Sequence, residues 1–476
     1  MTSPAVSFEV NPPSDSAVQL QANSADDSSD AAAAPASASS TSADVLPEVA
    51  EALGAMLQQL SVIQGAATDA ERDAGYDALA GMLDEVQKKQ PPPAEAPPPA
   101  EPRRPRPLTR QYSNASTYSP GLARQTPVPV STNTRVYDEF VASMPSQAGK
   151  TAFVTGSNTG LGFFAAKALA KRGATVVLLC RSVEKAEAAK REMVAELGED
   201  AAIETAHLDL SSLASVRECA ATLRARHAKC HMLLLNAGLM AVHHDLTEDG
   251  HDVQLQVNHL GHFLLAHELL PLLVAAGASG APARVVSHAS HAHHLGWPSF
   301  SAATADGPVG GGFRALPLGL AAWVPGASCW ARYGQSKLCN VLFTAELQRR
   351  LAANGAGVIA TAAHPGVAFT QLVQVAAGAN PLWDYLPSWH RYVPAAEAVG
   401  VAQSCADGST PLLLAATDAE AVGGEYYGPA KHVVGAPVRD VVRGYGNDEV
   451  MARELWTWSE AACGLTYEDV YARLRK

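Results

Sequence analysis

The stretch Thr151–Gly162, TAFVTGSNTGLG, constrains the fold of this 476-residue chain more than any other. An apolar run leads into Thr155-Gly156, and a helical pattern, FFAAKALAKR, follows Gly162. The order strand, glycine-rich turn, helix is that of the first unit of a dinucleotide-binding sheet. Gly156, Gly160 and Gly162 let the backbone turn tightly and approach a pyrophosphate, because no side chain stands between them. Their G-x-x-x-G-x-G spacing is weak support alone, so the downstream sequence has to agree with it.

Strand and helix patterns alternate from residue 136 to the end of the chain. The expected strands are the one ending at Thr155 and those over 174–180, 203–208, 232–235, 284–287 and 357–362. The expected helices cover 184–197, 213–227 and 252–274, with another from about 332 and further helices after 362. Such alternation produces a parallel sheet with helices on both faces. We therefore predict an α/β fold over 136–476: a Rossmann-type doubly wound parallel sheet of about seven strands.

Three segments of different composition precede this domain. Residues 1–42 are rich in Ala, Ser, Asp and Pro and are predicted to be disordered, because they have little apolar surface to bury. Residues 43–90 contain two amphipathic helical patterns, which predict a helical hairpin. Residues 91–135 form a proline-rich and then basic linker. The hairpin either packs on the rest of the chain or binds a protein partner, including a second copy.

Charge and cysteine usage narrow the class of protein. Residues 1–100 hold 15 Asp or Glu and 3 Lys or Arg, so they carry the whole net charge of −12. The distribution of charge in either part of the chain gives no support to nucleic-acid binding. Seven scattered cysteines without a C-x-x-C pair favour a reducing compartment. No uncharged apolar run reaches the roughly 18 residues that a membrane span needs. We expect no transmembrane segment and a cytoplasmic location, with import into an organelle such as a plastid left open.

Residues beyond the strand ends are the candidates for cofactor binding, since ligands of such sheets bind there. Arg181 follows the second strand, where an arginine suits the 2′-phosphate of NADP and a carboxylate would suit NAD. Asp209 follows the third strand and could accept from the adenine amino group. Asn236-Ala237-Gly238 follows the fourth strand and allows close approach of the backbone. We therefore expect NADP(H) in preference to NAD.

Tyr333 and Lys337, in YGQSK, carry the catalytic signal. Side chains four residues apart at the start of a helix project from one face. An ammonium beside a phenol favours the phenolate, so we expect Lys337 to lower the pKa of Tyr333. The tyrosine could then give a proton to a carbonyl oxygen or take one from an alcohol. Lysine could also hold the nicotinamide ribose.

A T-G-x-x-x-G-x-G turn, N-A-G, an Asn in the next helix and Y-x-x-x-K, in this order, resemble the short-chain dehydrogenase/reductases from roughly Gly149 to the C-terminus. The segments most similar to the retinol dehydrogenase-like branch are Leu246–Leu265, Arg284–Gly296, Tyr333–Leu347 and His364–Thr370. A more distant resemblance is to light-dependent protochlorophyllide reductases, which also have a cysteine near Y-x-x-x-K, as Cys339 is here.

The resemblance implies a catalytic tetrad. In it Asn258 supports a proton-relay water, Ser290 positions the substrate oxygen, Tyr333 is the acid/base and Lys337 is its partner. Pro365-Gly366 and Thr370 match the segment that binds the nicotinamide carboxamide in the family. The residues expected to contact the cofactor are Thr155, Gly156, Ser157, Asn158, Gly160, Leu161, Gly162, Arg181, Asp209, Leu210, Asn236, Ala237, Gly238, Tyr333, Lys337, Pro365, Gly366 and Thr370.

Two departures from the family pattern bear on the site. The usual Ser-Ser pair after the fifth strand is Ala289-Ser290 here, with Ser287 as the alternative. The loop 295–330 is long and carries five aromatic residues, which suit either an apolar lid over the substrate or a surface insertion that packs on itself. Four histidines over 288–294 have no Cys or carboxylate near them in sequence, so we expect no metal.

The sequence therefore predicts an NADP(H)-dependent oxidoreductase of the EC 1.1.1 type that acts on a small hydrophobic carbonyl or alcohol, with reduction as the preferred direction. The alternative is an NADP-binding scaffold or regulatory protein that turns nothing over and uses its N-terminal extension to dock partners. The pairing of Tyr333 with Lys337 argues against the alternative, because a protein that only binds the cofactor needs neither.

Overall fold

The computed structural model describes residues 133–242, 245–278, 280–295, 327–368, 370, 402–442 and 444–474. All of them belong to the second of two compact units, Gln87–Lys476. The predicted acidic segment, the helical hairpin and the linker up to residue 132 lie outside the described residues. Most of the long loop 295–330, expected to be either a lid or a surface insertion, lies outside them as well, over 296–326.

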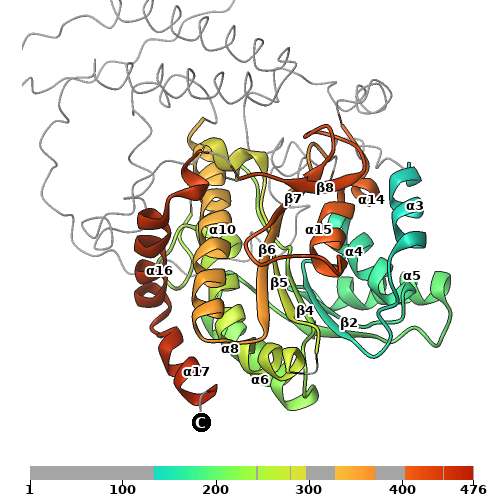
Figure 1. Cartoon of the computed structure of the whole chain (residues 1–476), viewed down its shortest axis with the longest axis horizontal. Coiled ribbons are helices and arrows are strands. Elements are labelled where there is room, and N and C mark those ends of the chain that lie inside the picture. Colours follow the sequence, from blue (N-terminus) through green and yellow to red (C-terminus); the bar gives the residue numbers. More distant parts are fainter. Residues whose placement is uncertain are drawn as a thin grey trace, which may run out of the picture. The chain divides into compact units, whose positions relative to one another are not determined.

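Eight strands form one sheet in the order β3-β2-β1-β4-β5-β6-β7-β8 (Figure 1). They are β1 Thr151–Thr155, β2 Thr175–Cys180, β3 Ile203–His207, β4 Met232–Leu235, β5 Ala283–His288, β6 Val358–Ala363, β7 Tyr426–Pro429 and β8 Pro437–Asp440. Neighbours from β3 to β7 pair in parallel, and β8 pairs antiparallel with β7. The strand order reverses between β1 and β4, the switch point where such sheets bind ligands. The predicted Rossmann-type doubly wound sheet is confirmed.

The described residues form eight strands, where about seven were expected. The six strands located from the sequence are β1 to β6, and β7 and β8 lie in a region for which only further helices were predicted. The two missed strands, YYGP and PVRD, have four residues each and contain prolines and a glycine. β8 lies at the sheet edge and has half-buried and exposed residues only, whereas all four residues of β7 are buried, so neither strand alternates between buried and exposed positions. β8 also makes the sheet mixed rather than purely parallel.

Helices cover both faces of the sheet (Figure 1). The helices are α3 Arg135–Ser143, α4 Gly160–Lys171, α5 Val183–Leu197, α6 Leu213–Arg226, α7 Val253–Leu255, the π-helix η3 Gln256–Leu260, α8 Gly261–Gly277, the 3₁₀ turn η4 His291–Leu295, α10 Ala327–Ala353, α14 Cys405–Gly408, α15 Thr410–Thr417, the 3₁₀ turn η7 Gly444–Asn447, α16 Glu449–Cys463 and α17 Tyr467–Leu474. Two buried cores result. Phe153 in β1 packs with α6, α8, α10 and α16, whereas its neighbours Ala152 and Val154 pack with α3, α4, α5 and α15. Alternate side chains of one strand thus serve opposite faces.

The continuous helix Val253–Gly277 is long and apolar enough to cross a membrane by length and composition. However, 67% of its most apolar window is buried inside the fold. Phe263, Leu264 and Leu269 on α8 are completely buried in the core that α6 and α10 also line. The apolar character of α8 is therefore accounted for by its position as a core helix.

The first helix of the described residues is α3, which starts one residue before the boundary predicted at 136. Tyr137 anchors this helix, because its N–H donates to Asp407 Oδ1 at 2.9 Å and its hydroxyl donates to the carbonyl of Phe164 at 3.0 Å.

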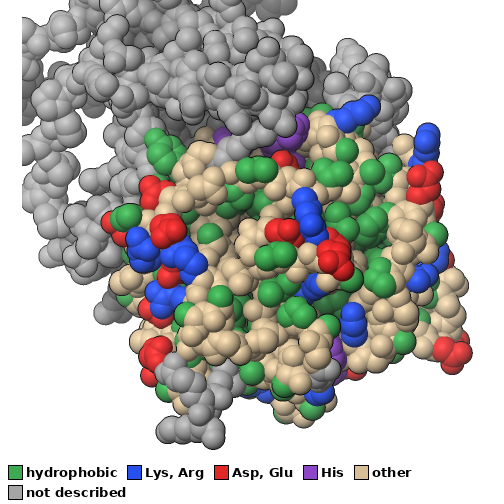
Figure 2. Space-filling model, in the orientation of Figure 1, with side chains coloured by type: hydrophobic (Ala, Val, Ile, Leu, Met, Phe, Trp, Pro, Cys, Tyr) green, Lys and Arg blue, Asp and Glu red, His purple; other side chains and the backbone are tan. Residues whose placement is uncertain are grey.

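On the face that Figure 2 shows, acidic and basic side chains of the described residues are intermingled among apolar ones, without a large patch of either sign.

Candidate active site

The glycine turn between β1 and α4 has the close backbone contacts that the sequence indicated. Gly156 has φ +63°, and a Cβ there would lie 2.8 Å from the Cα of Ala237. A Cβ at Gly162 would lie 2.4 Å from Asn236 Nδ2. Gly160 differs, since at φ +61° the nearest atom to an added Cβ is Cβ of Thr370 at 3.9 Å. Gly156 and Gly162 thus pack the turn against the end of β4, whereas an added Cβ at Gly160 would make only an ordinary van der Waals contact with Thr370.

Thr155 and Asn236 tie the ends of β1 and β4 together at the switch point. Thr155 Oγ1 accepts from the N–H groups of Asn236 and Ala237, both at 2.9 Å. Asn236 Nδ2 donates to the carbonyl of Thr155 at 2.9 Å. His262 Nε2 also lies 2.9 Å from Thr155 Oγ1. These side chains hydrogen-bond to one another or to the strand ends. We therefore expect them to shape the floor of the cofactor site.

The expected cofactor residues farther out have mixed surroundings. Arg181 is exposed directly after β2, next to Ser182, which caps α5. Ser157 is fully buried and its hydroxyl donates back to the carbonyl of Val154 at 2.8 Å, so that hydroxyl faces the protein. Asp209 Oδ1 accepts from the N–H and the hydroxyl of Ser211 at 2.9 and 2.6 Å. Leu210 is buried, whereas Asn158 and Leu161 are half-buried on the turn itself.

The segment after β6 returns to the glycine turn. Gly366 has φ +63°, and a Cβ there would lie 2.2 Å from the carbonyl oxygen of Val433. Gln403 Nε2 donates to the carbonyl of Pro365 at 2.7 Å. The Cβ of Thr370 lies 3.9 Å from the position of an added Cβ at Gly160. The structure therefore brings the expected nicotinamide segment against the expected pyrophosphate turn.

Tyr333, on α10, lies at the centre of the candidate site. Its side chain is 6% exposed, and its hydroxyl is hydrogen-bonded to Ser290. Ser287, the alternative, is buried in β5 and its hydroxyl has no hydrogen-bond partner. Chain direction after β5 explains the difference, because Ser290 leaves the sheet towards α10 and Ser287 does not. Trp330 packs edge-on against the Tyr333 ring with centroids 5.9 Å apart.

Lys337 follows Tyr333 by one helical turn, and its Nζ lies 5.8 Å from the centre of the Tyr333 ring. That Nζ donates to the carbonyl of His288 at 2.8 Å, at the end of β5. Only 5% of the residue is exposed. A Cβ at Gly238 would lie 3.6 Å from the same Nζ, so the N-A-G segment borders the lysine.

Asn258 sits in the middle of the π-helix η3, a distortion that often marks functional positions. Its Oδ1 accepts from the N–H of Leu239 at 2.7 Å, and its Nδ2 donates to Ser336 Oγ at 2.8 Å. Ser336 in turn donates to the carbonyl of Tyr333 at 2.7 Å. The Asn258 carbonyl accepts from Asn340 Nδ2 at 2.7 Å. These contacts make Asn258 a bridge between the end of β4 and α10; its part in a water relay stays a proposal.

Burial sets the direction of the pKa shifts of Tyr333 and Lys337. Burial raises the pKa of Tyr333 to about 12, and the hydrogen bond with Ser290 offsets this only in part. Burial also lowers the pKa of Lys337 to about 8. Loss of water therefore favours the neutral form of both side chains, and the expected effect of Lys337 on Tyr333 stays a prediction.

Four supporting residues escaped the sequence analysis: His262, His288, Ser336 and Asn340. Each contacts an expected site residue rather than the open space, as the bonds to Thr155, Lys337 and Asn258 show. One signal was available, because His262 lies four residues after Asn258 and therefore on the same helix face. The other contacts join distant segments and have no local pattern.

The residues present fit a dinucleotide. Thr159, which caps α4, makes no side-chain hydrogen bond to the first turn of that helix. The N–H groups at the start of a 12-residue helix, preceded by a glycine turn, are the arrangement that binds a pyrophosphate. Lys337 and the segment from Pro365 to Thr370 then border the place where the nicotinamide end would lie.

Fold and site together define a class of protein: an oxidoreductase built on a dinucleotide-binding sheet, with a buried tyrosine and lysine at the switch point. The family model for short chain dehydrogenase matches residues 150–305. Retinol dehydrogenase 13 of Homo sapiens is 37% identical over 327 residues, which are 67% of this chain and 87% of that protein. Retinol dehydrogenase 11 of Mus musculus is 35% identical over 318 residues, with 67% and 87% covered.

A crystal structure of an uncharacterized protein from Mycobacterium Paratuberculosis is 33% identical, with a TM-score of 0.51 and coverage of 69% of this chain and 98% of that one. The chain therefore belongs to the short-chain dehydrogenase/reductase family, and it is similar to the retinol dehydrogenases within it. The predicted family and branch are confirmed. The protein is thus an oxidoreductase of a family that uses a nicotinamide cofactor and acts on alcohols and carbonyls.

Proposed function

We propose that the protein reduces a hydrophobic carbonyl with NADPH, with Tyr333 as the proton donor. The observation that carries this proposal is the buried position of Tyr333 beside Ser290, with Lys337 Nζ 5.8 Å from the centre of the Tyr333 ring. A bound NADPH would supply the hydride. Ser290 and Tyr333 would both contact the substrate oxygen, and the Tyr333 hydroxyl would give its proton to that oxygen. Lys337 would hold the nicotinamide ribose.

The protonation state of Tyr333 suits the role of proton donor in the reduction that we propose. A phenol whose pKa is raised to about 12 keeps its proton at neutral pH and can donate it. Oxidation of an alcohol would need the phenolate, which burial disfavours. For the substrate, retinoid-like and other lipid carbonyls are favoured by the names of the similar proteins and by the apolar ring of Trp330 beside Tyr333.

Steady-state assays with hydrophobic aldehydes and ketones test this proposal. Tyr333→Phe removes the proton donor and keeps the ring, so kcat is expected to fall by about 10²- to 10⁴-fold while NADPH binding persists. Tyr471→Phe is the matched control, because Tyr471 is buried and its hydroxyl has no hydrogen-bond partner. Equal activity of Tyr333→Phe and wild type would refute the role of Tyr333. Tight NADPH binding without turnover of any carbonyl would instead support the scaffold alternative.

A further inference from the structure

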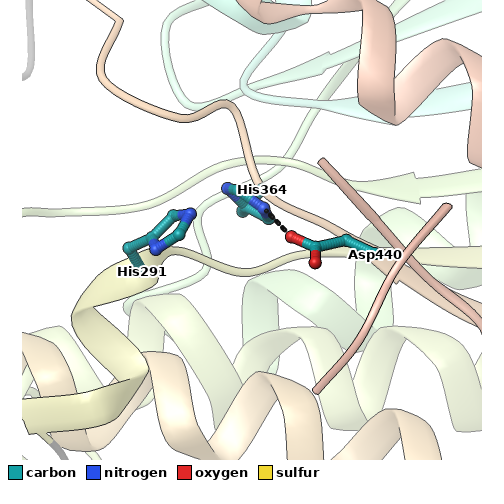
Figure 3. Close-up of side chains that lie close together, drawn as sticks. All are labelled: His291, His364 and Asp440. Carbon is teal, nitrogen blue, oxygen red and sulfur yellow. Dashed lines mark hydrogen bonds and ion pairs between the residues drawn. The ribbon is translucent and has the colours of Figure 1, made fainter. Parts of the chain in front are cut away.

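Beyond the cofactor site, a second cluster of titratable side chains gathers at the carboxyl ends of β5 and β6. His291 in η4, His364 directly after β6 and Asp440 at the end of β8 each offer one ligand atom, and these atoms lie within 4.8 Å of one another. Figure 3 shows the two imidazoles side by side and the carboxylate directed at His364. We infer that this cluster is a binding site for a divalent transition-metal ion, with Zn²⁺ as the ion that fits best.

The donor set suits zinc. Two imidazoles and one carboxylate are a common zinc-binding combination, and imidazole also suits the neighbouring transition metals. His364 Nε2 and Asp440 Oδ2 are already 3.0 Å apart, close to the roughly 3.3 Å between two ligands of a tetrahedral zinc ion. His291 has to move closer. Its Nε2 is buried without a hydrogen-bond partner, so rotation towards an ion costs it no existing bond.

A fourth donor is held nearby by an unusual backbone conformation. His432 has φ +59°, a value that residues other than glycine rarely adopt. In this conformation its Nδ1 lies 3.6 Å from Asp440 Oδ2, and its ring centre lies 6.3 Å from that of His291. Three imidazoles and a carboxylate would complete a tetrahedral site.

The hydrogen bond from Gly366 to His364 opposes metal binding and should lower the affinity for the ion. The N–H of Gly366 donates to His364 Nδ1 at 3.2 Å, so the proton of the neutral ring is on Nε2, shared with Asp440. An ion on Nε2 moves that proton to Nδ1, and the Gly366 N–H then loses its acceptor. We therefore expect weaker binding than in structural zinc sites, with a shift of the Gly366 turn.

The histidines that the sequence grouped do not form this site together. His288 Nδ1 is bonded to Asn236 Oδ1 at 2.8 Å, and His293 Nδ1 to the carbonyl of Ser290 at 2.7 Å. Only His291 of the four belongs to the three-residue cluster. Its partners come from β6 and β8, which is why spacing along the chain indicated no metal.

Equilibrium dialysis of the full-length, chelator-treated protein against Zn²⁺, with elemental analysis, tests the site. His291→Ala and Asp440→Asn should each lose one equivalent of Zn²⁺, or weaken its binding by at least the roughly 10- to 100-fold typical of losing a supporting residue. His207→Ala is the matched control and should bind as wild type, because His207 is exposed on β3 at the opposite edge of the sheet.

Co²⁺ provides an independent spectroscopic measurement. Wild type and His207→Ala should show the visible absorption of a four-coordinate Co²⁺ ion, and His291→Ala should lack it. Circular dichroism establishes that each variant is folded, and His291→Ala is the milder change because Nε2 has no partner to lose. The same stoichiometry and affinity in all four proteins would overturn the inference. Equal loss in His207→Ala would overturn it too, since the ion would then bind imidazoles without preference.

Discussion

At the scale of the residue, burial sets the chemistry of Tyr333 and Lys337. Each is at most 6% exposed, and loss of water favours the neutral form of both side chains. For the tyrosine this keeps the proton in place for donation. For the lysine, burial lowers the pKa to about 8, which lies inside the pH range where the enzyme can be assayed.

A pH profile follows from the lysine. Below about pH 8 Lys337 carries its charge and can hold the cofactor ribose; above it the charge is lost. We expect kcat/KM for reduction to fall as pH rises through about 8. Lys337→Arg should be less active at every pH but should lack this decline, because guanidinium stays protonated. A decline at the same pH in both proteins would assign it to another group.

Arg181 is expected to set the choice between NADPH and NADH. It is exposed immediately after β2, where the ribose 2′-phosphate of a bound NADP would lie. A hydrogen bond to a charged group is worth about 1.5–3 kcal/mol, so Arg181→Ala should weaken NADPH binding by about 10- to 150-fold and leave NADH unchanged. Fluorescence titration with both nucleotides measures this. Arg191→Ala, exposed on α5, is the control. A parallel loss of both nucleotides would rule out 2′-phosphate recognition.

At the scale of the element, the glycine turn and the strand ends form one packed unit. Gly156 has a positive φ, and a Cβ added to it would lie 2.8 Å from the Cα of Ala237. An alanine there is therefore strained and also collides with the backbone. Gly464 after α16 has nearly the same φ, +62°, but nothing lies within 4 Å of an added Cβ. Alanine substitutions at the two glycines therefore distinguish the effect of backbone strain alone from that of strain combined with a steric clash.

Gly464→Ala is expected to lower the free energy of unfolding by about 1–2 kcal/mol, the cost of a left-handed conformation. Gly156→Ala should lower it by more and should also abolish cofactor binding, because the end of β4 has to move away. Urea unfolding and NADPH titration of both variants measure the two effects. Equal destabilisation with intact cofactor binding would show that the turn tolerates a side chain.

The elements differ in how far the sequence could predict them. The unit β1–turn–α4 and the spacing of Tyr333 and Lys337 are encoded locally, by apolar runs, glycines and the helical repeat. The family resemblance indicated Ser290, with Ser287 as the alternative. The residues themselves could not decide between the two, because the position of each serine depends on the path of the chain after β5. The contact of His364 with Asp440 joins residues 76 apart and requires the edge hairpin β7–β8, whose short strands have no pattern of their own.

At the scale of the whole molecule, the described contacts of the site are all made within residues 133–474. α3 belongs to this body, because Tyr137, Val141 and Met144 are each 2% exposed and pack with α4 and the sheet. The acidic net charge, in contrast, resides in the first 100 residues. We therefore predict that residues 133–474 keep their fold and activity without the N-terminal extension.

Two truncations that differ only by α3 test this division. A chain beginning at residue 133 should keep the kcat and the melting temperature of the full-length protein. A chain beginning at residue 145 should melt at a lower temperature, because three buried side chains are lost, each worth about 1.5–3 kcal/mol. Thermal unfolding and carbonyl reduction measure both. If the chain from 133 folded normally yet had lost turnover, the extension would take part in catalysis; if it kept turnover but no longer bound a partner or itself, the extension would serve docking.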